Sequence, residues 1–62
     1  MNNLKFLREE KNISQMQLAL KIGVSQQAVA KWETGESKPR TEKLIQLAKL
    51  FGCTVDELLR GD

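Results

Sequence analysis

The chain has 62 residues, a size near the lower limit for a domain that buries a core without disulfides, a metal or a partner, so we expect one domain spanning residues 1–62. Its apolar share of 40% and charged share of 29% exclude a disordered or fibrous chain. No apolar run is long enough to span a membrane or to form a signal peptide, so we expect a soluble cytoplasmic protein. One cysteine and no histidine argue against a disulfide, a metal site, a cofactor or an enzyme, while the net charge of +2 is too small to identify a nucleic-acid partner by itself.

The opening segment predicts a helix over residues 3–11. Leu4 and Leu7 fall on the inward side of this helix, whereas Arg8 falls among the charged residues that we expect to face solvent. Asn12 tolerates left-handed backbone, so the helix is expected to end there.

The second helix is predicted to begin at Gln15, because Ser14 followed by Gln17 is a capping-box pattern. Gly23 ends this helix. Ser25 is a further capping residue, so a third helix is expected to begin after a connection of about three residues. An apolar residue precedes each predicted cap and can act as a hydrophobic staple, namely Ile13, Val24 and, before the fifth helix, Cys53.

The third helix is predicted to end at Gly35, and a polar connection follows it. Thr41 is predicted to cap a fourth helix that ends at Gly52. Thr54 with Glu57 forms another capping box, which begins a short fifth helix. No segment alternates polar and apolar residues as a strand would, so the predicted fold class is all-α with five helices.

Two short helices joined by a tight turn that contains glycine make a helix-turn-helix, and the second and third predicted helices have this form. Val29 and Trp32 fall on the inward side of the third helix, which turns Gln26, Gln27 and Lys31 outward. Glutamine can bond bidentately to adenine, and lysine suits guanine, in the major groove of DNA. We therefore predict that these three outward residues read bases.

Other residues near this motif are predicted to hold the phosphate backbone. Gln15 begins the second helix, whose N–H groups and positive dipole end favour an anion. Lys38, Arg40 and Lys43 lie close together just after the motif and can neutralise phosphates. A solvated basic face is the alternative reading of those three residues.

Several conspicuous residues have structural interpretations. We expect Trp32 to be part of the core, Glu33 to brace the turn through a hydrogen bond or an ion pair, and Cys53 to act as a small hydrophobe. Met16 and Leu20 form an apolar pair four residues apart on the second helix. They are either isolated surface residues or a contact with a partner chain, and both readings stay open.

Taken together, these residues make the chain similar to the lambda-repressor-like helix-turn-helix family, of the phage-repressor or xenobiotic-response-element type. The resemblance covers nearly the whole chain and is carried by Ser14-Gln15, Leu18-Ala19, Ile22-Gly23-Val24-Ser25, Val29, Lys31-Trp32-Glu33, Gly35, Pro39, Leu44, Leu47-Ala48, Phe51-Gly52 and Val55-Asp56-Glu57-Leu58-Leu59. It implies a five-helix DNA-binding domain. The resemblance also implies that residues at the positions of Gln15 and Ser25 chiefly hold phosphate, and that those at the positions of Gln26, Gln27 and Lys31 contact the operator.

The function expected from this resemblance is that of a sequence-specific transcriptional regulator, a repressor from a bacterium or phage. It is expected to bind double-stranded DNA as a homodimer, formed in solution or only on DNA, with a modest contact in the region of the fourth and fifth helices. The alternative is a protein-interaction module of the same fold, such as an antitoxin or a domain of a larger regulator. The exposed pair Met16 and Leu20 motivates that alternative.

Overall fold

The computed structural model describes residues 3–60, and the five predicted helices are all present within that range. They are α1 (Asn3–Glu10), α2 (Gln15–Ile22), α3 (Gln26–Thr34), α4 (Thr41–Phe51) and α5 (Val55–Leu59). No residue from 3 to 60 lies in a strand, so the all-α prediction is confirmed. The expected domain limits, 1 and 62, lie outside the described residues. Between residues 3 and 60, no helix combines the length and the apolar character that crossing a bilayer requires.

Both predicted capping boxes form. The Ser14 hydroxyl oxygen accepts from the Gln17 N–H at 3.0 Å, and the Gln17 side-chain oxygen accepts from the Ser14 N–H at 2.7 Å. In α5 the matching distances between Thr54 and Glu57 are 3.0 and 2.9 Å. These reciprocal bonds satisfy N–H groups that a helix start leaves without an intrahelical partner, which explains why both helices begin where the sequence predicts.

The predicted start of α4 is wrong by one residue. Arg40, and not Thr41, occupies the cap position, and no side chain caps this helix. The Arg40 carbonyl already accepts from the N–H groups of Lys43 and Leu44, each at 2.9 Å. With this start, the Lys43 ammonium lies 3.0 Å from the Ile22 carbonyl and donates to it. A capping pattern involves only neighbouring residues, so it cannot predict a contact between two helices.

All five helices contribute to one core. Val29 is 0% exposed and Trp32 is 5% exposed, so the prediction that both turn inward is confirmed. The predicted staple residues Ile13, Val24 and Cys53 are partly buried against this core. The core consists of nine buried side chains, Leu4, Leu18, Ala19, Ile22, Val29, Trp32, Leu47, Phe51 and Leu58. Burial of these side chains is the main favourable contribution to folding.

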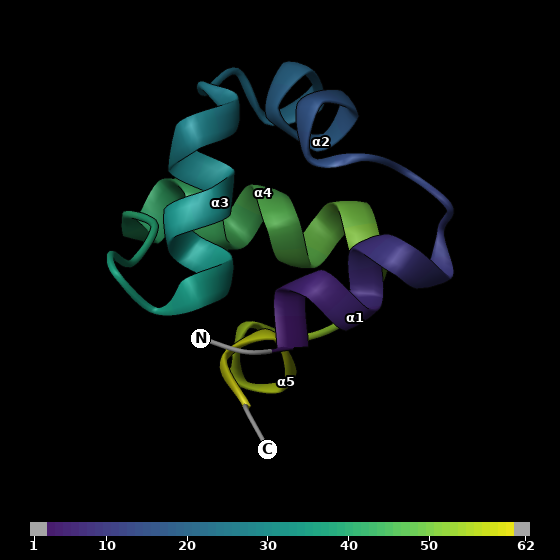
Figure 1. Ribbon diagram of the computed structural model, residues 1–62. Coiled ribbons are helices and arrows are strands. Elements are labelled where there is room, and N and C mark those ends of the chain that lie inside the picture. The colour runs from purple at the N-terminus through teal and green to yellow at the C-terminus, as the bar shows by residue number, and fades with distance from the viewer. Residues whose placement is uncertain (1–2, 61–62) are drawn as a thin grey trace.

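The helices pack so that α3 forms one side of the molecule. α2 packs extensively on α3, α1 packs beside α5, and α4 crosses between these two pairs (Figure 1). The turn between α2 and α3 is as short as predicted, because Gly23 adopts a left-handed conformation with φ +80° that residues other than glycine rarely adopt. This turn leaves the outer side of α3 uncovered by any other helix in Figure 1.

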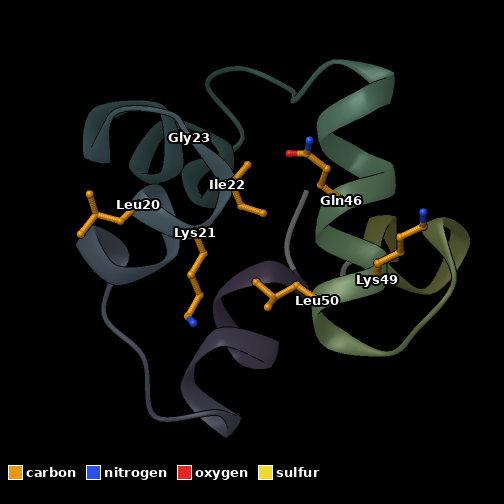
Figure 2. Close-up of a pocket in the computed structure, with 7 residues that line it drawn as sticks. All are labelled: Leu20, Lys21, Ile22, Gly23, Gln46, Lys49 and Leu50. Atoms are coloured by element: carbon orange, nitrogen blue, oxygen red, sulfur yellow. The ribbon is translucent and has the colours of Figure 1, made fainter.

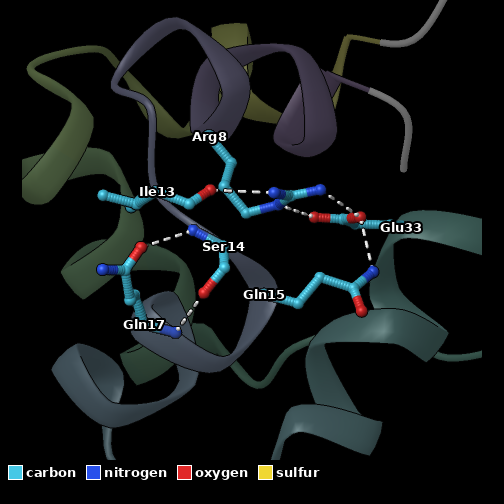
Figure 3. Close-up of polar contacts among 6 residues, drawn as sticks. All are labelled: Arg8, Ile13, Ser14, Gln15, Gln17 and Glu33. Atoms are coloured by element: carbon cyan, nitrogen blue, oxygen red, sulfur yellow. Dashed lines mark hydrogen bonds and ion pairs between the residues drawn. The ribbon is translucent and has the colours of Figure 1, made fainter.

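The prediction that Arg8 faces solvent is wrong, because its guanidinium is buried against α3. Its Nε donates to Glu33 Oε2 at 2.7 Å and its Nη1 donates to the Ile13 carbonyl at 2.8 Å (Figure 3). Gln15 Nε2 donates to the other Glu33 carboxylate oxygen at 2.9 Å. The hydrogen bond with Glu33 raises the pKa of Arg8 above its ordinary value, against the opposing effect of burial. The expected hydrogen bond and ion pair of Glu33 are thereby confirmed, but they join α3 to α1 and to the start of α2, and do not brace the turn.

Glu57→Gln should remove an acid-sensitive contribution to stability without removing the α5 cap. The backbone and side-chain hydrogen bonds from Thr54 lower the pKa of the Glu57 carboxyl. The ionised Glu57 carboxylate therefore stabilises the fold fully at pH values above the pKa of this group in the unfolded chain, about 4.3. This stabilisation is lost as the pH falls through the lower pKa that Glu57 has in the folded chain. Gln17 shows that an uncharged amide serves at the same position in α2.

Thermal melting at pH 7 and at pH 3 checks this prediction. The Glu57→Gln variant should lose less of its stability between the two pH values than the unmodified chain. Equal losses would show that the lowered pKa of Glu57 does not affect folding.

Candidate nucleic-acid interface

The reading surface predicted on α3 is exposed and is held by a well-defined helix. Ser25 begins the helix, and its hydroxyl oxygen accepts from the Ala28 N–H at 3.1 Å. Gly35 ends it in a left-handed conformation. Because 100° separates successive residues of an α-helix, the burial of one stripe turns the remaining side chains to the opposite side. That side carries the three exposed side chains predicted to read bases, Gln26, Gln27 and Lys31.

The chemistry of this surface matches the edges of bases. Gln26 and Gln27 each offer one amide acceptor and two amide donors, and Lys31 offers a cation one turn further along. Ala30 lies half-buried on the same side, so a small methyl separates the polar groups. An α-helix with its side chains is about 10–12 Å across, which fits the width of the major groove, about 12 Å.

The two residues expected to hold phosphate at helix starts have defined roles within the fold. Gln15 is half-buried, and the bond from its Nε2 to Glu33 holds its amide group beside α3 (Figure 3). That bond uses one of the two amide hydrogens and leaves the second available to donate to a phosphate oxygen. The Ser25 hydroxyl accepts within its own cap, so its proton remains available to donate.

The structure brings the three predicted basic residues together beside the start of α4. Lys38, Arg40 and Lys43 line a hollow of about 340 Å³, and the other residues that line it are Val24, Trp32, Pro39 and Glu42. Lys38 and Arg40 are exposed. This grouping places two solvated cations next to the helix-turn-helix.

Lys43 differs from the other two basic residues. It is half-buried, and its ammonium donates to the Ile22 carbonyl at the end of α2 at 3.0 Å. A cation at this position is favoured, because the last carbonyls of a helix lack intrahelical partners and carry the negative end of its dipole. Lys43 therefore joins α4 to α2, and the two remaining hydrogens of its ammonium can reach outward.

Arg8 is the residue near this site that the sequence analysis misplaced. Through Glu33 it positions Gln15 and α3 relative to α1. A signal for this role is present in the sequence, because Arg8 lies four residues after the buried Leu4 and therefore on the same stripe of α1. A charged residue in an inward stripe indicates a buried partner.

Comparison with known proteins adds independent findings. A family described as "Helix-turn-helix" matches residues 4–58. The chain is 46% identical over 59 residues to the HTH-type transcriptional activator BcrR of Enterococcus faecalis. The aligned region covers 95% of this chain and 29% of that protein. The chain is also 40% identical over 55 residues to Repressor protein C2 of Salmonella phage P22. This aligned region covers 89% of this chain and 26% of that protein.

A solved structure is similar as well. The crystal structure of the P22 c2 repressor protein in complex with a synthetic operator superimposes with a TM-score of 0.86 at 37% identity, and the match covers 95% of this chain and 89% of that one. The chain thus spans less than a third of the length of the two curated relatives, whereas it spans most of the chain in this structure.

Proposed function

Because this chain belongs to the lambda-repressor-like helix-turn-helix family of DNA-binding transcriptional regulators, we propose that it represses transcription by inserting α3 into the major groove of a two-fold operator. Within this proposal Gln26, Gln27 and Lys31 read bases. The protein acts on double-stranded DNA in the cytoplasm and needs no cofactor for binding.

One observation carries the proposal. The burial of Val29 and Trp32 turns the two neighbouring glutamines and Lys31 outward on the side of α3 that no other helix covers (Figure 1). A protruding, convex helix with amide groups suits a groove of DNA, whereas a small substrate needs a concave pocket. The operator complex of the P22 c2 repressor, one of the solved structures similar to this chain, supports the same use of the fold.

The backbone contacts follow from the groups around α3. Gln15 and Ser25 stand at the starts of α2 and α3, where N–H groups and the helix dipole favour a phosphate. Lys38 and Arg40 add positive charge beside the start of α4, in the hollow that Val24 and Trp32 also line, and Lys43 reaches the same region from α4. These contacts position the protein and do not distinguish sequences.

A two-fold operator requires two copies of the chain. We expect a homodimer whose modest contact lies in the region of α4 and α5, where Ile45 and Leu59 are exposed. Two recognition helices then enter the groove about 34 Å apart, which corresponds to half-sites spaced by roughly 10 base pairs. Assembly on DNA is sufficient for this arrangement.

Selection from random-sequence duplexes tests the proposal. We expect enrichment of a two-fold repeated sequence whose half-sites are about 10 base pairs apart. In transcription with purified polymerase, the chain should lower the output of a promoter that overlaps the selected site. Failure to enrich any sequence would refute sequence-specific binding, and increased output would refute repression.

Lys38→Ala and Arg40→Ala should weaken binding to all duplexes alike. Each lost phosphate contact should reduce the slope of log K against log salt by about 0.9. Binding measured from low to moderate salt on the selected duplex and on a scrambled duplex checks this prediction. Lys5→Ala, which removes the same charge from an exposed position on α1, serves as the control and should leave the slope unchanged. A loss of discrimination between the two duplexes would instead assign base reading to Lys38 or Arg40.

A further inference from the structure

A groove between α2 and α4 is separate from the candidate DNA interface. It is a hollow of about 510 Å³, formed by the end of α2 and the second half of α4 (Figure 2). None of the residues assigned to DNA lines it. The lining residues are Leu20, Lys21, Ile22, Gly23, Gln46, Lys49 and Leu50.

The groove has apolar surface and positive charge together. Leu20 is 77% exposed, and Met16, one turn before it on α2, is 56% exposed. In Figure 2 the Leu50 side chain points toward α2, between the side chains of Lys21 and Lys49, whereas the Leu20 side chain points away from α4 and lies at the rim of the groove. No acidic residue lines the groove, so both exposed lysines lack an opposite charge within it.

This combination selects one kind of occupant. A small molecule is disfavoured because the hollow is open to solvent and each polar side chain that lines it is exposed. A nucleic-acid backbone would pair with the lysines but would leave the large apolar side chains on α2 without a partner. An amphipathic helix satisfies both features, because apolar residues on its face enter a groove between two helices while carboxylates along its flanks meet the lysines.

We propose that the α2–α4 groove docks an acidic amphipathic helix of another protein, with apolar side chains against Leu20 and Leu50 and carboxylates paired with Lys21 and Lys49. This proposal goes beyond DNA binding and does not depend on it. Because no residue is shared between the groove and the candidate DNA interface, both surfaces can be occupied at once.

The test uses the 62-residue chain labelled with nitrogen-15 and two synthetic helical peptides. One peptide carries leucines four residues apart with glutamates along both flanks, and the other is identical except that each glutamate is a lysine. The acidic peptide should shift the amide signals of Leu20, Lys21, Lys49 and Leu50, and added salt should weaken its binding. The basic peptide should not bind. The shifts should persist when the chain is bound to its selected duplex.

Charge reversal provides the matched variants. The double variant Lys21→Glu with Lys49→Glu should bind the acidic peptide roughly tenfold more weakly and should gain affinity for the basic peptide. The control Lys5→Glu with Lys11→Glu makes the same change in net charge at exposed positions of the first helix and the turn after it, and should bind as the unmodified chain does. Melting curves of both variants establish that they are folded.

Four results would overturn the proposal. The first is the absence of binding by the acidic peptide, and the second is equal binding of both peptides. The third is self-association of the unmodified chain that Leu20→Glu abolishes, which would assign the groove to a second copy. The fourth is a loss of duplex affinity in the Lys21 and Lys49 variant that exceeds the loss in the control, which would assign the groove to DNA.

Discussion

Glu33→Ala should lower the free energy of unfolding by about 3–5 kcal/mol, the usual cost of removing one partner from a buried ion pair. The side chains of Arg8 and Glu33 are only 11% and 4% exposed, so the loss of the carboxylate leaves a guanidinium away from water with its main acceptor gone. Gln15 loses an acceptor as well. A domain of this size has a total stability of roughly 3–9 kcal/mol, so the substitution should remove about a third of it or more.

Urea unfolding followed by circular dichroism measures this effect. Glu36→Ala is the matched control, because it removes the same charge from an exposed residue three positions later and should change stability by less than about 0.5 kcal/mol. Replacing both partners, as Arg8→Met with Glu33→Leu, should recover part of the loss, since no unpaired charge remains. A Glu33→Ala variant as stable as Glu36→Ala would show that the ion pair does not hold α1 to α3.

Gln26→Ala and Gln27→Ala should each weaken binding to the selected duplex by about 1–3 kcal/mol, which is about 5-fold to 150-fold in Kd. Each substitution removes an amide that can bond bidentately to one base, so the preference should relax at one position of each half-site. Affinity for a scrambled duplex should change little, because the phosphate contacts remain.

Fluorescence anisotropy on the selected duplex, and on duplexes altered at single positions, measures both effects. Gln46→Ala on α4 is the control, because it removes an equally exposed amide from a different surface. Both glutamine variants should melt as the unmodified chain does, since neither side chain is packed. If sequence preference is unchanged in both variants, the assignment of α3 as the reading helix fails.

The helix boundaries other than the start of α4 could be predicted from the sequence because the signals that set them are local. The capping boxes of α2 and α5 consist of residues three apart, and their hydrogen bonds form wherever such a helix starts. The left-handed ends at Asn12 and Gly23 likewise depend on one residue each. For the same reason the side chains on the outer side of α3 could be predicted, since the apolar stripe determines which side is buried.

The contacts between distant residues could not be predicted in this way. Arg8 and Glu33 are 25 residues apart, and Lys43 and Ile22 are 21 apart. Both pairs meet only after the helices have packed. The spacing from Leu4 places Arg8 on the inward stripe of α1, but no local pattern identifies Glu33 as its partner or shows that Lys43 caps another helix. The roles of the reading and phosphate residues at DNA stay predictions.

The bond from Lys43 to the Ile22 carbonyl has a consequence for recognition. It holds the end of α2 at a set distance from the start of α4, so the proposed backbone contacts of Gln15 on α2 and of Arg40 before α4 cannot move apart independently. A duplex must then supply phosphates at a matching separation, and its ability to do so depends on how easily the groove widens or narrows. We therefore expect affinity to vary with base pairs that no side chain touches, in proportion to the local stiffness of the DNA.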